Sequence, residues 1–306
     1  MDAVARKLKR KITETKKIDQ KNLAEGSFFL ESHEEDVEEL RDDFQAYLNG
    51  NRTHILRYYW AFLHELVELP IKLGMKRSLC NQHLEVAPLA QAAQAGYWWL
   101  VVGPEIAAHY HAENEKDADI WLLDAYRVIS YLILTGHKKE AAEASEVVVG
   151  ALKTPFLNGG SDWYTHPWFL LQLICRWQNV EVDLEGCDVP SDMGVYNAVL
   201  SQWDTTDVET VQELVNQMAS YHMDTARSDR NDDEINDFGD SDFWFFPYEI
   251  LTWLRIREEM GLPNPEAFEH PLMQQPLAAM PPATPFPKDE LLEQVVAKLK
   301  ADHGLS

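Results

Sequence analysis

The 306-residue chain is poor in the residues that mark several protein classes. Its three cysteines, Cys80, Cys175 and Cys187, are odd in number and far apart, so they predict neither a disulfide framework nor a zinc site. Basic residues are also scarce, because 27 lysines and arginines stand against 51 aspartates and glutamates, which gives a net charge of −24. That charge argues against direct binding to nucleic acid or to an anionic membrane, since both require a positive surface. We expect a basic protein partner instead.

Long hydrophobic runs and strand-like alternation are missing as well. No apolar run reaches the roughly 20 residues of a membrane-spanning helix, and the basic N-terminal stretch is not followed by the apolar segment of a secretory signal. Together with the few cysteines, this predicts a protein of the reducing cytoplasm. Alternation of apolar and polar residues with a period of two, which indicates a half-buried strand, is almost absent.

Hydrophobic residues nevertheless make up 45% of the chain, which is enough for a full core. They recur with the spacing of amphipathic helices. We therefore expect an all-α fold of packed antiparallel helix pairs with little or no β-sheet. The expected helices cover residues 34–48, 55–73, 87–102, 105–113, 119–134, 138–152, 162–177, 191–203, 208–221, 247–260 and 289–300.

Changes in composition suggest three segments. Residues 1–24 hold eight basic residues against three acidic ones, and we interpret them as a basic arm or first helix that is dispensable for folding. The Asn-Gly-Gly-Ser sequence that starts at residue 158 is the best interior linker. It separates an N-terminal helical domain, 25–157, from a C-terminal helical domain, 158–306. The second domain contains a proline-rich segment, 263–287, and the final helix.

A run of carboxylates lies directly before a cluster of aromatic residues between positions 224 and 260. The carboxylates repel one another and must face water or a cation, whereas the aromatic side chains must face a core. We interpret the run as an exposed acidic loop on a rigid helix, which binds a basic partner and can lose its charges at little cost in stability. An ordinary solvated loop is the alternative, with the acidic residues from Glu31 to Asp43 as the next candidate surface. The predicted partner-binding residues are Asp224, Asp229, Asp232, Asp233, Glu234, Asp237, Asp240 and Asp242.

Catalytic and metal-binding motifs are incomplete. His64 and Glu68 resemble half of a metalloprotease motif, but Glu68 occupies the place of the second histidine. The acidic run has the outline of a calcium loop, but Glu234 replaces the loop glycine. We predict no catalytic residue, metal or cofactor, and we assign Glu249 a supporting role through hydrogen bonds. A metal-dependent hydrolase built on His64, Glu68, His109 or the acidic loop remains an alternative.

The aromatic cluster also carries a family resemblance. Phe245-Phe246-Pro247-Tyr248-Glu249, followed by an apolar helix, resembles the Tyr-Trp-x-Phe-Glu signature of the PoNi-type immunity proteins. Phe245 and Phe246 stand at the Tyr and Trp of that pattern, Tyr248 at its Phe and Glu249 at its Glu. The apolar helix from Tyr126 to Leu134, the turn after it and the next helix are similar too, so that the resemblance extends over roughly residues 30–270.

The PoNi-type proteins guard bacteria against polymorphic nuclease toxins that secretion systems deliver, the type VI system among them. The resemblance implies an all-α, acidic protein without enzymatic activity, which neutralises its cognate toxin, expected to be a DNase, by direct binding. A nuclease needs a cationic cleft to hold DNA phosphates, and an acidic surface can occupy that cleft. An acidic helical adaptor for another basic protein is the alternative. The resemblance leaves open the oligomeric state and which acidic face makes the contact.

Overall fold

The computed structural model describes residues 3–51, 54–112, 120–158, 164–228 and 236–305. These residues form eleven α-helices and one pair of two-residue strands, so the predicted all-α fold is confirmed. The α-helices are α1 (Ala3–Asn22), α2 (Phe28–Leu48), α3 (Leu56–Asn81), α4 (Val86–Ala112), α5 (Leu122–Leu134), α6 (Lys138–Ala151), α7 (His166–Trp177), α8 (Val195–Ser201), α9 (Val208–Thr225), α10 (Tyr248–Glu259) and α11 (Glu290–His303).

Short elements connect some of these helices in the described part of the chain. The strands β1 (Ile120–Trp121) and β2 (Leu157–Asn158) pair in parallel, with Ile120 opposite Leu157. Three 3-10 helices, η2 (Ser241–Phe243), η3 (Pro271–Gln274) and η4 (Pro276–Ala278), lie in the segments that flank α10. Among the described residues, no helix is long and apolar enough to cross a membrane.

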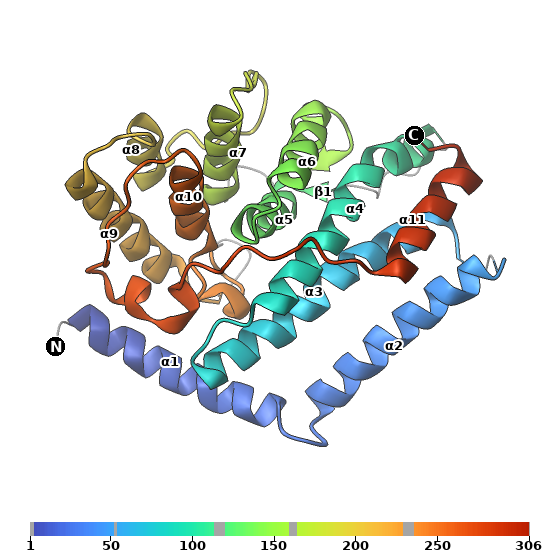
Figure 1. Cartoon of the computed structure of the whole chain (residues 1–306), viewed down its shortest axis with the longest axis horizontal. Coiled ribbons are helices and arrows are strands. Elements are labelled where there is room, and N and C mark those ends of the chain that lie inside the picture. The colour runs from blue at the N-terminus through green and yellow to red at the C-terminus, as the bar shows by residue number, and fades with distance from the viewer. Residues whose placement is uncertain (1–2, 52–53, 113–119, 159–163, 229–235, 306) are drawn as a thin grey trace.

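The two longest helices, α3 and α4, lie side by side through the middle of the molecule (Figure 1). Their close approach depends on small residues. A Cβ atom added to Gly74 of α3 would lie 2.6 Å from Cβ of Pro88, and one added to Gly96 of α4 would lie 2.5 Å from a methyl group of Val128 in α5. Since real Cβ atoms do not approach so closely, glycine at these positions permits the α3–α4 and α4–α5 packing.

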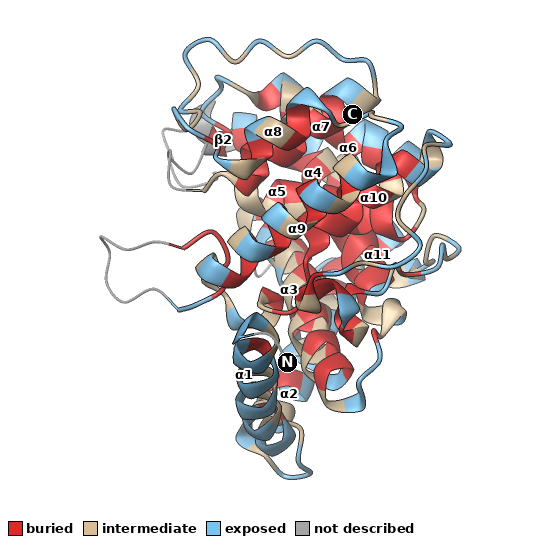
Figure 2. Cartoon of the chain, turned by 90° about the vertical axis from the view of Figure 1, so that its left-hand side faces the viewer, coloured by how far each residue is buried: buried red, intermediate tan, exposed pale blue. Residues whose placement is uncertain are grey.

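One hydrophobic core extends through both halves of the chain. Helix α5 is buried along its whole second half and packs against α4 on one side and against α7 and α10 on the other. Helix α11, from the end of the chain, returns to pack against α2 and α4 (Figure 1). Figure 2 shows the buried faces of these helices meeting inside the molecule. The expected boundary at 157/158 therefore runs through a shared core.

Helix α1 packs on the body of the protein, which decides between the two interpretations of the N-terminal segment. Leu8 is buried, and the ammonium group of Lys11 lies 3.8 Å from the ring centroid of Trp244 and donates to the carbonyl oxygen of Ala226. Asp19, further along the same helix, is also buried. Residues 3–22 are thus a packed first helix, and these contacts argue against the expectation that the segment is dispensable for folding.

Helix α4 differs from the prediction, because it continues through the expected break at Gly103 and Pro104. A proline in a helix interior removes one backbone hydrogen bond. The helix persists here because Val102 and Ile106 are both buried in the core. Gly103 leaves room for the rings of Trp60 and Phe156, which lie within 3.3 Å of where its Cβ atom would be.

Candidate functional site

The side chains of Tyr248 and Glu249 point into the core. The hydroxyl of Tyr248 lies 2.7 Å from Nε2 of His166, and Oε1 of Glu249 lies 2.9 Å from Nδ1 of His222. The other ring nitrogen of His222 lies 3.2 Å from the carbonyl oxygen of Phe243. Glu249 therefore ties α10 to α9 and, through His222, to the loop before α10. The predicted supporting role of Glu249 is confirmed, and its full burial keeps it from contact with a partner.

Asp237, a member of the acidic run, is also buried, with only 4% of the residue exposed. Its Oδ1 accepts a hydrogen bond of 2.8 Å from the backbone N–H of Thr165, and its Oδ2 accepts one of 2.8 Å from the hydroxyl of Tyr221. Burial alone would raise the pKa of Asp237. The nearby ring of His166, whose Nδ1 lies 3.7 Å from Oδ2, and the hydrogen bonds of Thr165 outweigh burial and lower that pKa.

The next two carboxylates of the run have internal partners as well. Asp240 precedes η2 and accepts a hydrogen bond of 3.0 Å from the backbone N–H of Asp242. The carboxylate of Asp242 lies 2.5 Å from Nζ of Lys76 in α3, and both side chains are 11% exposed. Asp224, at the end of α9, has 76% of its side chain exposed and lies 3.5 Å from Lys7 of α1.

The prediction that the run is an exposed acidic loop is therefore wrong for Asp237 and Asp242. Each lies next to an aromatic residue that enters the core, Phe238 and Phe243, and is carried inward with it. Charges removed from water need partners, and these are Thr165 before α7, Tyr221 of α9 and Lys76 of α3. The remaining predicted residues, Asp229, Asp232, Asp233 and Glu234, lie outside the described residues.

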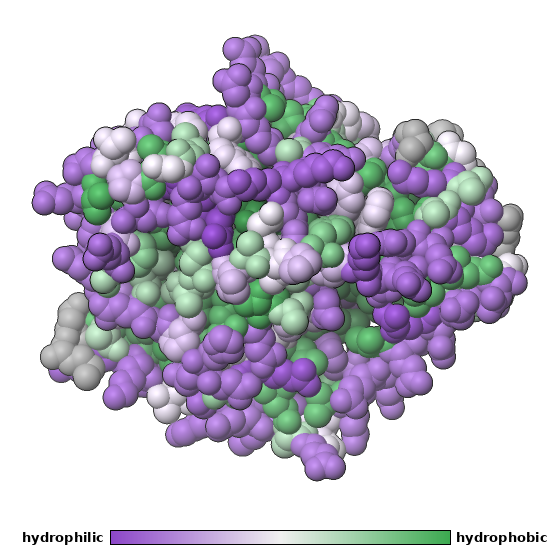
Figure 3. Space-filling view, viewed as in Figure 1, coloured by the Kyte–Doolittle hydropathy of each residue, from purple (hydrophilic) through white to green (hydrophobic). Residues whose placement is uncertain are grey.

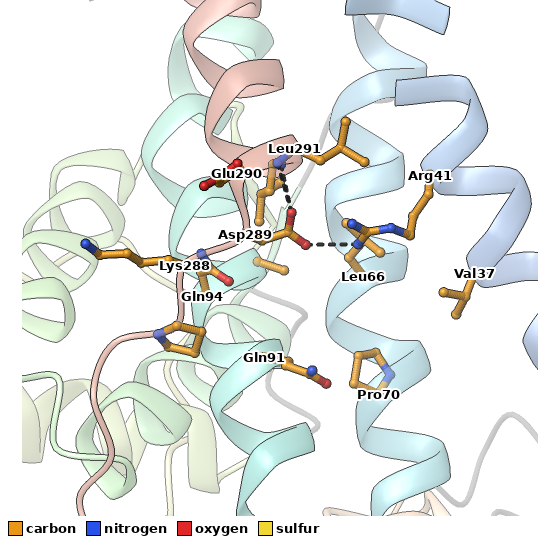
Figure 4. Close-up of a pocket in the computed structure, with 13 residues that line it drawn as sticks. Val37, Arg41, Leu66, Pro70, Gln91, Gln94, Lys288, Asp289, Glu290 and Leu291 are labelled. Carbon is orange, nitrogen blue, oxygen red and sulfur yellow. Dashed lines mark hydrogen bonds and ion pairs between the residues drawn. The ribbon is translucent and has the colours of Figure 1, made fainter. Parts of the chain in front are cut away.

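Helix α2 presents a continuous acidic surface. It contains eight acidic residues and a single arginine, Arg41. Nη1 of Arg41 lies 3.0 Å from Oδ2 of Asp289, which also caps the start of α11, so the one strongly basic side chain is turned toward the body (Figure 4). In Figure 3 the lower right edge, where α2 lies in Figure 1, is largely hydrophilic. The exposed carboxylates of α2, here called the acidic ridge, are Glu31, Glu34, Glu35, Asp36, Glu38, Glu39 and Asp42.

The acidic ridge is held firmly in place. The side chain of Ser27 caps α2 by accepting a hydrogen bond of 3.3 Å from the backbone N–H of Leu30. Leu40, Phe44 and Tyr47 form a buried stripe on the opposite face. The ring of Tyr47 packs 4.3 Å from that of Tyr59 in α3, and its hydroxyl donates to Asp302 of α11. Repulsion within the ridge is thus opposed by packing on the inner face.

A groove of about 670 Å³ lies between the acidic ridge and α3. Its rim is acidic and its floor is apolar, and Tyr58 at its mouth is 52% exposed. Such a groove can accept a cationic side chain at the rim and an apolar one on the floor. We call it the α2–α3 groove. Its lining residues are Asp36, Glu39, Leu40, Asp43, His54, Tyr58, Phe62, Glu65 and Leu69.

No family model, curated protein or solved structure matches this chain.

The residues of the alternative hydrolase are only partly together. His64 and Glu68 lie one turn apart on α3, with Asp124 of α5 beside them. His109, at the far end of α4, is outside this group and faces the ring of His303 at 6.3 Å between ring centroids. The sequence motif thus identified two of the three clustered residues. Asp124 was missed because only tertiary packing brings it to α3.

Proposed function

We propose that this protein is an immunity protein, which binds and neutralises an antibacterial nuclease toxin without enzymatic activity of its own. The observation that supports the proposal best is the acidic ridge of α2 beside the α2–α3 groove. Seven exposed carboxylates stand there on one rigid helix. The contact surface is thus assigned to α2, the next candidate after the acidic run.

The chemistry of a nuclease makes it a suitable partner. An enzyme that holds DNA phosphates presents a cluster of lysine and arginine side chains. Opposite charges on the two surfaces speed the encounter, and like-charged partners such as nucleic acid are rejected. The apolar floor of the groove would add binding affinity to the attraction between charges. The binding energy of protein interfaces concentrates at apolar and aromatic anchors that are surrounded by polar residues. Leu40, Phe62 and Tyr58 supply such an anchor point.

In this proposal the motif at residues 245–249 maintains the fold and does not contact the toxin. Tyr248 and Glu249 are buried and hold α10, α7 and α9 together. In our proposal they maintain the fold, while recognition of the toxin belongs to surface residues of α2 and α3. The proposal places the protein in the cytoplasm, where a nuclease would reach DNA. An acidic adaptor for another basic protein would use the same surface, and the identity of the partner distinguishes the two functions.

A pull-down from the native host with the wild-type protein as bait tests the proposal. The expected partner is a basic nuclease, identified by mass spectrometry, whose toxicity in cells is suppressed when this protein is co-expressed. A variant with the groove-rim substitutions Asp36→Asn, Glu39→Gln, Asp43→Asn and Glu65→Gln should fold normally and lose protection. Capture of a basic protein without nuclease activity would support the adaptor instead.

A matched control separates the location of the charges from their number. The variant with Glu181→Gln, Glu185→Gln, Glu209→Gln and Glu266→Gln also removes four negative charges, at exposed positions outside α2 and α3. It should protect cells as well as the wild type does. Equal loss of protection in both variants would mean that overall charge, and not the groove, governs binding.

A further inference from the structure

Three potential metal ligands meet between α3 and α5. A spacing of four residues places His64 and Glu68 on the same face of α3, and Asp124 projects from the first turn of α5. One ligand atom from each of the three side chains lies within 4.8 Å of the other two. All three are partly buried, with side-chain exposures between 19% and 29%.

The imidazole of His64 is fixed but incompletely bonded. Its ring packs against Trp99 with 4.6 Å between ring centroids. Its Nε2 atom is inaccessible to solvent and has no hydrogen-bond partner, and the nearest carboxylate oxygen, Oδ2 of Asp124, is 3.9 Å away. Buried polar atoms in proteins nearly always have a partner. One ring nitrogen of His64 and one oxygen from each of the two carboxylates lie close enough together to leave room for a bridging ion.

We propose that His64, Glu68 and Asp124 bind one divalent transition-metal ion, with Zn²⁺ as the preferred metal. One imidazole nitrogen and two carboxylate oxygens suit Zn²⁺, whereas Ca²⁺ and Mg²⁺ prefer oxygen ligands alone. Two ligand atoms that are each about 2.1 Å from a zinc ion lie at most about 4.2 Å apart. Shifts of the ligand atoms on the order of 1 Å would therefore bring all three within coordination distance of one ion.

Two basic side chains, Lys72 and Arg127, lie beside this site. Lys72 lies 3.8 Å from Oε2 of Glu68, and its side chain is 43% exposed, so it can move into solvent when the ion binds. Nη1 of Arg127 lies 3.5 Å from Oδ1 of Asp124, whereas the contact with His64 is made by Oδ2. The guanidinium of Arg127 packs 4.2 Å from the ring centroid of Phe243. Arg127 can keep this position while Oδ2 binds the ion. The ion would then link α3 directly to α5, independently of any toxin.

Titration of the metal-free, full-length protein with Zn²⁺ in a calorimeter tests this proposal, with thermal unfolding as a second readout. We expect one ion to bind per chain, and the melting temperature to rise as Zn²⁺ is added, because an ion that binds only the folded state stabilises it. His64→Gln and Asp124→Asn should each weaken binding by more than about tenfold. Both variants should remain folded without the ion, because these side chains are at the rim of the core.

His83→Gln is the matched control, since His83 is exposed and lies outside the group. It should bind Zn²⁺ as the wild type does. Absence of saturable binding to the wild type would overturn the proposal. So would binding of equal strength in the wild type, His64→Gln and Asp124→Asn, because the ion would then be held elsewhere.

Discussion

Asp237 and Asp242 show that the next residue in the chain can determine how far a carboxylate is exposed to solvent. Both stand in a run of carboxylates that is typical of a solvated loop, yet Asp237 is buried beside Phe238, and Asp242 is only partly exposed beside the buried Phe243. The sequence pattern could have indicated this, because each acid directly precedes a large aromatic residue. Their partners Thr165 and Lys76 could not be predicted, since only the packing of α7 and α3 places them there.

Replacing Asp237 by Asn should destabilise the protein at neutral pH. The carboxylate accepts hydrogen bonds from Thr165 and Tyr221, and loss of a buried, bonded acceptor typically costs about 1–3 kcal/mol in the free energy of unfolding. Urea unfolding measures the change. Asp224→Asn, at an exposed position, is the control and should change stability by less than about 0.5 kcal/mol. Equal stability of the two variants would show that the buried bonds of Asp237 contribute nothing.

Lowering the pH should remove the contribution of the Asp237 carboxylate to the stability of the wild type. The pKa of Asp237 is lowered in the folded state, so its ionised form stabilises the fold above the unfolded pKa of about 3.9. This stabilisation decreases as the pH falls through that value and through the folded pKa below it. The stability difference between wild type and Asp237→Asn should therefore shrink between neutral pH and about pH 3. A difference that is constant over this range would contradict the assignment.

Trp253 of α10 is a second residue with a large expected effect. It is fully buried, its Nε1–H donates to the carbonyl oxygen of Trp203 at 3.0 Å, and Arg257 lies over its ring. Truncation of a buried tryptophan costs about 3–5 kcal/mol. Trp253→Ala should therefore unfold the protein or lower its melting temperature severely, as measured by circular dichroism. Near-normal stability would mean that α10 is peripheral to the core.

Helix α2 shows which of its two ends can be predicted from the sequence. The apolar stripe and the Asn-Gly stop predicted the end of α2 correctly, while its start at Phe28 lies six residues before the predicted one. The cause is the Ser27 cap, which extends the helix by more than a turn beyond the stripe. The α2–α3 groove could not be predicted. A groove depends on how two helices are placed relative to each other, and the residue pattern of each helix alone does not contain that information.

Removal of residues 1–24 should lower the melting temperature. Deletion of α1 uncovers Trp244 and takes away the buried Leu8 and the Lys11 hydrogen bond to Ala226. The double substitution Arg6→Gln and Arg10→Gln changes exposed charges on the same helix and serves as the control. We expect the control to melt near the wild-type temperature. An unchanged melting temperature of the deletion would restore the interpretation of this segment as a dispensable arm.

Helical periodicity predicted the fold class of the chain, whereas the division into two domains at residue 157/158 stays a prediction from the linker. Helices α5 and α10, which lie on opposite sides of residue 158 in the chain, pack directly against each other. Glycine-rich linkers mark exposed turns equally well inside one domain and between two domains. Only tertiary contacts distinguish the two cases.

A shared core predicts a single cooperative unfolding transition. Because the buried residues of both halves form one cluster, neither half keeps a core of its own when the other unfolds. Differential scanning calorimetry should therefore show one peak for the wild-type protein. Two resolved transitions, with the N-terminal and C-terminal halves melting separately, would favour the boundary at 157/158.

The rate at which the proposed nuclease partner associates with the protein shows whether the α2–α3 groove makes the contact. Surface plasmon resonance should show rapid association of the wild type that slows as salt is raised, because screening shortens the reach of charges from about 10 Å at 0.1 M salt to about 3 Å at 1 M. The groove-rim variant of Asp36, Glu39, Asp43 and Glu65 should associate more slowly and depend less on salt, while the matched control variant should resemble the wild type. Wild-type kinetics in the groove-rim variant would contradict the account.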